Sequence, residues 1–236
     1  ILVRGLVVAV IGGITLITTH SVLFFSIFYF LSGDQNAEKL AMEYMSIRIL
    51  AAPFAISMFV FVGWLFGMGK TFHSLCLLVA VNVVNILLDI IFVKFLFLGI
   101  AGVAYATILS EFCGFALGIY LCKEFLFDKE NIKSKAIFLS NKWRSFIVLN
   151  INIVIRSTLL QSVFLSYLIF GPLFGSEILA ANHILLQIVF LSAYALDGVA
   201  FSSEIFVGEA IGQRRYQRFK KVVRSATKIG LIFSSA

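Results

Sequence analysis

Residues 74–97, SLCLLVAVNVVNILLDIIFVKFLF, form an apolar run that only two asparagines, one aspartate and one lysine interrupt after its first residue. As an α-helix, a run of this length crosses about 30 Å of hydrocarbon. Comparable runs lie at residues 5–32, 44–68, 100–122, 146–171 and 178–206, and another begins near residue 225. The sequence therefore predicts an all-α, polytopic membrane bundle with six complete transmembrane helices and the start of a seventh.

Composition supports a membrane protein and argues against other classes. Of the 236 residues, 61% are hydrophobic and 13% are charged, whereas globular proteins average about a quarter charged residues. The alternating segments of a transmembrane β-barrel do not occur in the sequence. The signatures of zinc proteases, serine hydrolases and phosphate-binding loops do not occur either, so we expect a protein that is not an enzyme and has no cofactor.

Basic residues collect on one side of the membrane if the six spans alternate in direction. Of the 19 lysines and arginines, 15 fall on that side. The positive-inside rule then makes the basic loops 123–145 and 209–228 cytoplasmic, in a multi-pass protein of a bacterial-type inner (plasma) membrane. The net charge of +7 then faces anionic lipid, and we expect no nucleic-acid partner. The 123–145 segment is also the longest polar break, and it separates two bundles at 1–122 and 146–236.

A polar stripe runs along the span with which we began. Asn82, Asn85 and Asp89 are three and four residues apart, which places them on one face of a helix. Such a stripe is expected to face the protein interior, because ionisable groups in contact with lipid are costly. Counting residues back from the tight turn to the next span predicts Asp89 at the level of Thr107 and Asn85 at the level of Glu111.

The oxygen atoms of this stripe indicate a site for a proton or for a hard cation such as sodium. We therefore predict an ion-coupling site, with sodium as the metal it would hold, at Asn85, Asp89 and Thr107. Asn82 and Glu111 are further candidates for the same site.

Ion pairing is the alternative use for charged residues at membrane depth. Asp89 would then pair with Lys94 or Arg48, and the asparagines would hold neighbouring helices together. Arg156 and Asp197 fall at one depth in their spans, and we expect them to form a structural ion pair, with a substrate-facing role as the alternative.

Further polar residues on the last two complete spans are candidates for a substrate cavity: Gln161, Asn182 and Gln187. His183 lies near the outer end of its span and is a candidate proton relay. Pro53 is expected to kink the second span, because it lacks an amide hydrogen and its ring clashes with the preceding turn.

The order of motifs resembles the multidrug and toxic compound extrusion (MATE) family, and more narrowly its DinF branch. These motifs are IRILAAP at 47–53, GWLFG at 63–67, NVVNILLDIIFV at 82–93, GVAYATILSE at 102–111, IRSTLLQ at 155–161 and LDGVAFSSEIFVGEAIG at 196–212. The resemblance covers nearly the whole chain.

This resemblance implies a fold of twelve helices in two six-helix lobes around a central cavity. The chain would be an internal part of a longer protein, supplying the third to eighth helices and the start of the ninth. Its partners would be the lipid bilayer, small organic substrates and the remaining helices of the same protein, which would be monomeric when complete. The 123–145 segment would connect the two lobes on the cytoplasmic side.

The implied activity is antiport, in which amphipathic or cationic organic compounds leave in exchange for protons or sodium. The resemblance places the family's ion site on Asn85, Asp89 and Thr107, together with an aspartate on a helix upstream of residue 1. Two alternatives stay open: a flippase for lipid-linked precursors, which would have more basic residues in its cavity, and a non-catalytic assembly subunit of a membrane complex.

Overall fold

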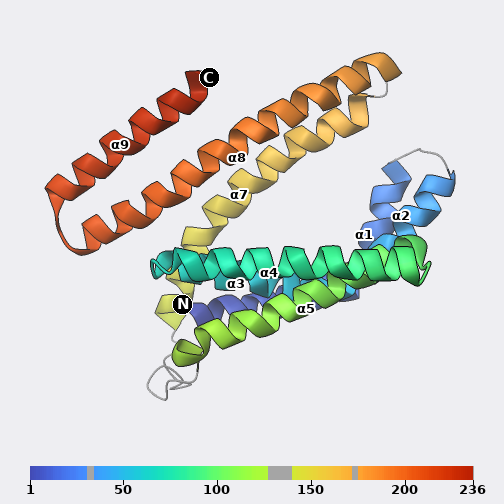
Figure 1. The fold of residues 1–236 in the computed structure, drawn as a ribbon, viewed down its shortest axis with the longest axis horizontal. Coiled ribbons are helices and arrows are strands. Elements are labelled where there is room, and N and C mark those ends of the chain that lie inside the picture. Colours follow the sequence, from blue (N-terminus) through green and yellow to red (C-terminus); the bar gives the residue numbers. More distant parts are fainter. Residues whose placement is uncertain (31–34, 127–139, 172–174, 236) are drawn as a thin grey trace. The chain divides into compact units, whose positions relative to one another are not determined.

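The computed structural model describes residues 1–30, 35–126, 140–171 and 175–235 (Figure 1). Its contacts divide the chain into two compact units, Ile1–Arg144 and Ser145–Ala236. Apart from short turns, the described residues are helical, which confirms the predicted all-α class. The two units are described separately below.

The first unit contains five α-helices among its described residues: α1 (Leu2–Phe30), α2 (Gln35–Arg48), α3 (Ala52–Gly67), α4 (Thr71–Asp89) and α5 (Gly99–Leu126). Helix α1 packs along α3, and α4 packs along α5. Helix α5 also packs against α2 and α3, so it contacts three other helices of this unit. Side chains from α5 therefore decide what the interior of the unit contains.

Pro53 produces the break that the sequence predicts in the second span. Helix α2 ends at Arg48, the 3-10 segment η1 (Ile49–Ala51) follows, and α3 begins with Pro53 in its first turn. Proline is tolerated at a helix start, where its missing amide hydrogen would have no intrahelical partner. Ser57 donates its hydroxyl to the Pro53 carbonyl at 2.6 Å, which binds the new helix start to its own second turn.

The C-terminal end of α4 has an irregular form that the sequence pattern does not predict. A π-helical segment, η2 (Ile90–Phe95), follows Asp89 directly. The chain then reverses through Phe97 and Gly99, whose φ angles are 54° and 56°. Glycine adopts such positive φ angles without strain, which explains its place at the first residue of α5.

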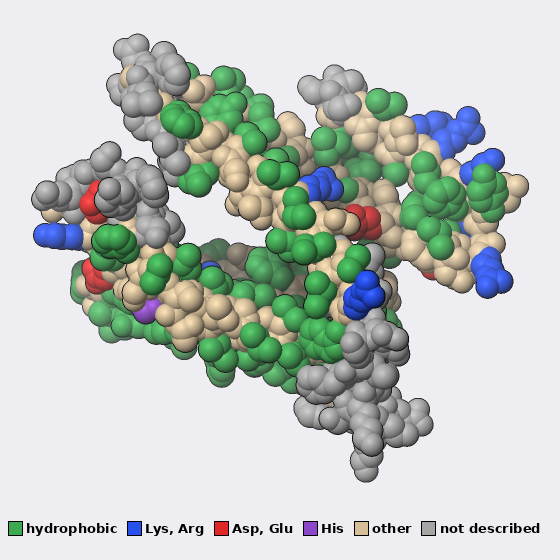
Figure 2. Space-filling view, turned by 180° about the vertical axis from the view of Figure 1, so that it is seen from behind, with side chains coloured by type: hydrophobic (Ala, Val, Ile, Leu, Met, Phe, Trp, Pro, Cys, Tyr) green, Lys and Arg blue, Asp and Glu red, His purple; other side chains and the backbone are tan. Residues whose placement is uncertain are grey.

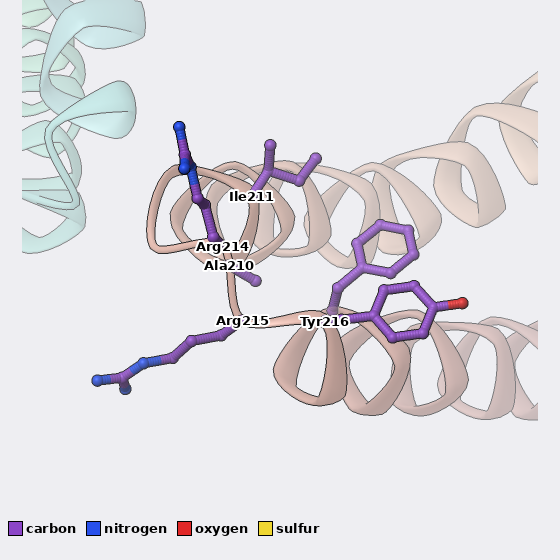
Figure 3. A pocket seen from close by; sticks show the side chains of 6 residues that line it. Ala210, Ile211, Arg214, Arg215 and Tyr216 are labelled. Carbon is purple, nitrogen blue, oxygen red and sulfur yellow. The ribbon is translucent and has the colours of Figure 1, made fainter.

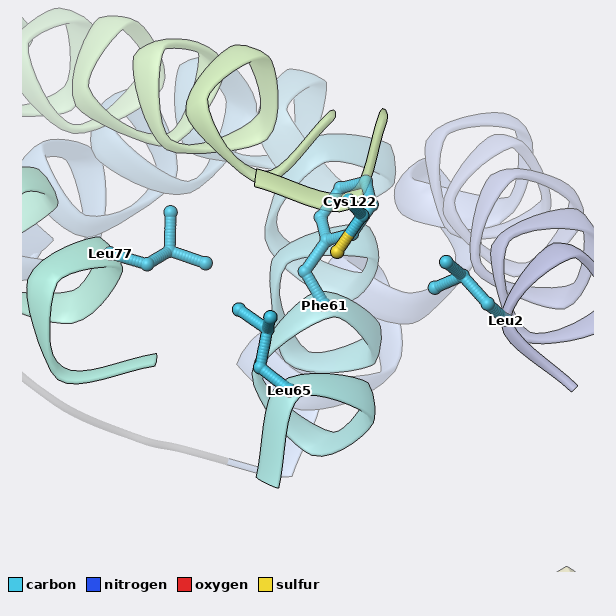
Figure 4. Packing of buried hydrophobic residues seen from close by; sticks show 5 residues of the cluster. All are labelled: Leu2, Phe61, Leu65, Leu77 and Cys122. Carbon is cyan, nitrogen blue, oxygen red and sulfur yellow. The ribbon is translucent and has the colours of Figure 1, made fainter. Parts of the chain in front are cut away.

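Small residues let α5 approach its neighbours closely. The core contains Phe61 and Leu65 from α3, Leu77 from α4 and Cys122 from α5, with Leu2 packed beside them (Figure 4). A Cβ atom added to Gly118 would lie 2.4 Å from the Phe61 ring. Gly114, one turn earlier, would meet Val81 of α4 at 2.3 Å. These two glycines form a GxxxG spacing, which is typical of membrane helices in close contact.

The second unit contains α7 (Ser140–Phe170, of which the first residues belong to the first unit), α8 (Ser176–Gly212) and α9 (Tyr216–Ser235). Phe164 of α7 and Phe190 of α8 contact each other, with ring centroids 5.1 Å apart. Helices α8 and α9 pack together after a short turn at residues 213–215. Figure 1 shows α8 and α9 as a helical hairpin.

Residues 209–228, predicted to connect two spans, are largely helical, because α8 continues to Gly212 and α9 begins at Tyr216, before the helix start expected near residue 225. Lysine, arginine and glutamine are good helix formers, so a basic sequence does not interrupt a helix. Of the other predicted loop, 123–145, residues 123–126 lie in α5 and 140–145 in α7, and 127–139 lie outside the described residues.

The described stretches that are long and apolar enough to cross a membrane are Leu2–Phe25, Glu38–Gly67, Thr71–Phe95, Gly99–Leu126 and Ala181–Gly212. They overlap five of the six predicted spans. The sixth, predicted at 146–171, falls largely on α7, several of whose side chains lie outside the described part of the chain. Hydrophobic side chains are spread over the visible face of the helices (Figure 2), as expected for a surface in contact with lipid.

Replacement of Gly118 by alanine tests the close contact of α5 with α3. The added methyl group would overlap the Phe61 ring, so we expect Gly118→Ala to lower the free energy of unfolding by about 1–3 kcal/mol. Thermal unfolding of the purified full-length protein in detergent, followed by circular dichroism, measures the change. The matched control is Gly63→Ala on α3, where an added Cβ meets nothing within 4 Å. Equal losses in both variants would show that the glycines do not act through packing.

Candidate functional site

The centre of the candidate site is a hydrogen bond between α4 and α5. The Asn85 Nδ2 group donates to the Thr107 hydroxyl oxygen at 3.3 Å, and both residues are half-buried. Thr107 in turn donates its own hydroxyl hydrogen to the Val103 carbonyl at 2.8 Å. Because these donors are engaged, the Asn85 carbonyl oxygen and the second lone pair of the Thr107 oxygen are the groups suited to accept a proton donor or bind a cation.

Asn85 meets Thr107 in the structure, whereas the sequence predicted Asn85 at the level of Glu111. The prediction counted every residue of the span as α-helical. The wider turns of η2 rise less per residue, so Asn85 lies nearer to the turn between the two helices than an α-helix would place it. The prediction that α4 and α5 bring these polar side chains together is correct, but its register differs.

Asp89 lies one helical turn beyond Asn85, on the same face of α4, and is the last residue of that helix. Its Oδ1 atom is buried and has no hydrogen-bond partner. A buried oxygen without a partner is costly, and a carboxylate more so, unless a proton or a cation joins it. Among the described residues, Asp89 therefore has the one carboxylate oxygen that is both buried and without a hydrogen-bond partner.

The structural alternative for Asp89 is not realised in the described residues. Arg48 pairs instead with Glu111, whose two oxygens accept from the guanidinium at 2.6 and 2.9 Å. Lys94 is exposed and forms no ion pair with Asp89. Asp89 is thus left without either of the basic partners that the sequence offered.

Two of the further candidates for the ion site are engaged elsewhere. Both oxygens of Glu111 bond to Arg48, so this carboxylate links α5 to α2 instead of joining the Asn85–Thr107 pair. Asn82 is exposed and donates to the Leu78 carbonyl of its own helix at 2.8 Å. The described residues contain no cluster of three or more His, Cys, Asp or Glu side chains that could hold a metal ion, so a cation here would depend on amide and hydroxyl oxygens as well.

The ion pair predicted between Arg156 and Asp197 is not formed, and both side chains are exposed. The depth estimate does not include rotation about the helix axis. Arg156 is eight residues before Phe164, which turns it about 80° away from the side of α7 that contacts α8. The two charges therefore lie at similar depth but on different sides.

The predicted cavity residues stay candidates for a substrate cavity. Gln161, Gln187 and His183 are exposed, and Asn182 is half-buried. None of them lines either of the two pockets that the structure forms between α8 and α9. The smaller of these pockets, about 310 Å³ in volume, lies at the turn between the helices and is lined by Arg214, Arg215 and four further residues (Figure 3).

Sequence reasoning missed the Arg48–Glu111 pair, although it identified both charges at membrane depth. The available signal was only that each charge needed a partner, because depth alone favoured Asp89 over Glu111 as the partner of Arg48. The pairing requires α2 to pack on α5, and that contact follows from the fold, not from local spacing.

The fold and the site together define a multi-pass helical membrane protein with a polar site between two of its spans. The MatE family model matches residues 153–236. DNA damage-inducible protein F of Escherichia coli (strain K12) is 30% identical over 99% of this chain and 52% of its own length. The probable multidrug resistance protein YoeA of Bacillus subtilis (strain 168) is 27% identical over 93% of this chain and 47% of its own length.

Solved structures show the same fold. A transporter of the MOP superfamily from Pyrococcus furiosus, 24% identical, superimposes with a TM-score of 0.78 over 97% of this chain and 51% of its own. An outward-facing MATE family transporter, 22% identical, gives a TM-score of 0.72 over 98% of this chain and 52% of its own. This chain belongs to the MATE family, which confirms the resemblance of its motifs, and it spans about half the length of the relatives it matches.

A double-mutant cycle tests the Arg48–Glu111 pair. Glu111→Gln leaves a guanidinium without its counter-ion, so we expect a loss of about 3 kcal/mol in the free energy of unfolding. This is the lower part of the usual range, because the Arg48 side chain is 31% exposed. The double variant Arg48→Met, Glu111→Leu should lose less than Glu111→Gln alone. Thermal unfolding measures these variants and the single variants Arg48→Met and Glu111→Leu that complete the cycle. Additive losses of the two single variants would show that the two residues do not interact.

Proposed function

We propose that this chain forms part of an antiporter that exports amphipathic or cationic organic compounds in exchange for protons or sodium. Membership of the MATE family supports this function, as does the similarity to YoeA, a probable multidrug resistance protein. In this proposal, residues 1–122 and 146–236 belong to two lobes that move against each other, joined by 123–145. Alternating movement of the lobes would open the substrate site to each side of the membrane in turn.

The buried, unpartnered Oδ1 atom of Asp89 is the observation that carries the proposal. A coupling site must bind its ion and also release it, so its carboxylate cannot be held permanently by a lysine or arginine. In this protein, Arg48 is occupied by Glu111, and Asp89 forms no ion pair with a described residue. The Asn85–Thr107 pair, one turn away, supplies oxygens that attract a cation without neutralising the carboxylate.

Ion binding would act on the helices through this site. When Asp89 is empty, its negative charge lies in a poorly hydrated environment, which favours movements that bring it to water. When a proton or sodium ion is bound, the charge is compensated and the closed arrangement of α4 and α5 becomes favourable. The same ion thereby provides the free energy that drives a compound outward.

Replacement of Asp89 by asparagine removes the charge and keeps the shape of the side chain. We expect Asp89→Asn to reduce ion-driven efflux of a fluorescent cationic dye to the background rate. The measurement uses proteoliposomes that contain the full-length protein, with sodium and proton gradients imposed separately. The gradient that drives efflux in the unaltered protein identifies the coupling ion.

The matched control for this experiment is Asp197→Asn. Asp197 is also an aspartate within a candidate span, but it is exposed and makes no ion pair among the described residues. The control variant should keep most of the efflux at an equal amount of reconstituted protein. Retained efflux in Asp89→Asn, or equal loss in both variants, would contradict the assignment of Asp89.

The orientation proposed for the chain places its basic segments, 123–145 and 209–228, on the cytoplasmic side of the inner (plasma) membrane. Single cysteines at Lys94 and Lys123 test this in a protein whose natural cysteines, those at positions 76, 113 and 122 among them, have all been replaced. We expect a membrane-impermeant thiol reagent to label Lys94→Cys in intact cells, and Lys123→Cys only after the membrane is opened. The reverse pattern would invert the proposed topology.

A further inference from the structure

A groove of about 670 Å³ runs between α8 and α9. Val199 and Phe206 form part of its wall on α8, and Val222, Ile229 and Phe233 form part of its wall on α9. Ala181–Gly212 is one of the candidate membrane spans, so the α8 wall of the groove is at membrane depth. The groove therefore offers a long apolar surface to whatever occupies the adjacent bilayer.

Two of the three serine residues that line the groove use their hydroxyl hydrogens within α8. Ser202 donates its hydroxyl to the Gly198 carbonyl at 2.8 Å, and Ser203 donates to the Val199 carbonyl at 2.6 Å. Both hydroxyl hydrogens are thus used within α8, and the wall exposes few free donors. An occupant that is mainly hydrocarbon fits such a surface.

One end of the groove is cationic. Arg218 and Lys221 line it close to the start of α9, where α8 has just ended. Arg218 is already bound to Glu209 at 2.9 Å, whereas Lys221 makes no ion pair with any described residue. Residues 210–236 contain seven lysines and arginines and no acidic residue, and Figure 2 shows Lys and Arg side chains gathered around α9.

The length of the groove corresponds to one leaflet of a bilayer. Lys221 and Phe233 are twelve residues apart on α9, which is about 18 Å along the helix axis. Half of the hydrocarbon core of a bilayer measures about 15 Å. A lipid whose phosphate lies at Lys221 would therefore have an acyl chain that ends near Phe233.

We propose that this groove binds one anionic phospholipid, with its acyl chain between α8 and α9 and its phosphate against Lys221. The charge of the basic end selects an anionic over a zwitterionic headgroup. The pocket at the α8–α9 turn is less suited to the phosphate, because the side chains of Arg214 and Arg215 point in different directions there (Figure 3). The bound lipid would hold α8 and α9 together near the turn between them, where most of the basic residues of this unit lie.

Quenching of a tryptophan in the groove by brominated lipid tests this site. The reporter is Phe206→Trp in the full-length protein, with every natural tryptophan, Trp64 and Trp143 among them, replaced by phenylalanine. The vesicles consist of phosphatidylcholine with a minor fraction of phosphatidylglycerol, and one of the two lipids carries the bromine. We expect phosphatidylglycerol to quench more per molecule than phosphatidylcholine, and Lys221→Gln to reduce this preference about fivefold.

Two matched controls separate a site from general attraction to the surface. Lys220→Gln removes the same charge one residue away, outside the groove, and should leave the preference nearly unchanged. Gly198→Leu should fill the groove and reduce quenching by both lipids, whereas Gly208→Leu, outside the groove, should not; an added Cβ meets nothing within 4 Å at either glycine. Equal effects of Lys220→Gln and Lys221→Gln, equal effects of the two leucines, or no preference for phosphatidylglycerol would each overturn the proposal. The readout requires no transport, so its outcome is independent of the proposed antiport.

Discussion

The close packing of α5 against α3 and α4 is the contact on which the first unit depends. In a bilayer, neighbouring helices gain little from the hydrophobic effect, so their association relies on dispersion contacts and hydrogen bonds at short range. Gly114 and Gly118 permit this short range by leaving space for Val81 and Phe61. The same packing brings Thr107 beside Asn85 and Glu111 beside Arg48, so the polar contacts of the unit follow from apolar ones.

Two carboxylates of this unit, Glu111 on α5 and Asp89 on α4, differ in their partners. This difference distinguishes a structural residue from a candidate functional one. Glu111 is fully engaged by a guanidinium, and such a pair is costly to break because each charge would be left alone at low dielectric. Asp89 of α4 forms no ion pair with a described residue and keeps a buried oxygen without a partner. The Arg48–Glu111 pair joins α2 to α5 and gives that part of the bundle rigidity. The unpartnered carboxylate of Asp89, at the end of α4, has the capacity to bind an ion.

Much of the fold could be predicted from the sequence, because hydrocarbon thickness sets the length of each apolar run and polar breaks mark its ends. The polar stripe of Asn85 and Asp89 could be predicted for the same reason, since helical periodicity fixes which residues share a face. Three features could not. The π-helical turns after Asp89 change the rise per residue, and nothing in the residue composition indicates them. The Arg48–Glu111 pair depends on tertiary packing. The basic start of α9 is as compatible with a helix as with a loop.

The π-helical segment also changes the direction in which the side chains that follow it point around the helix axis. In an α-helix, each residue advances by about 100° around the axis, and a stretch of wider turns delays this advance. Side chains before Ile90 and after Phe95 therefore follow two different angular phases, although they belong to one continuous span. The polar stripe of Asn85 and Asp89 can face α5 while the residues after η2 are oriented for the reversal at Gly99. A single helix thereby meets two geometric demands that a uniform α-helix could not satisfy together.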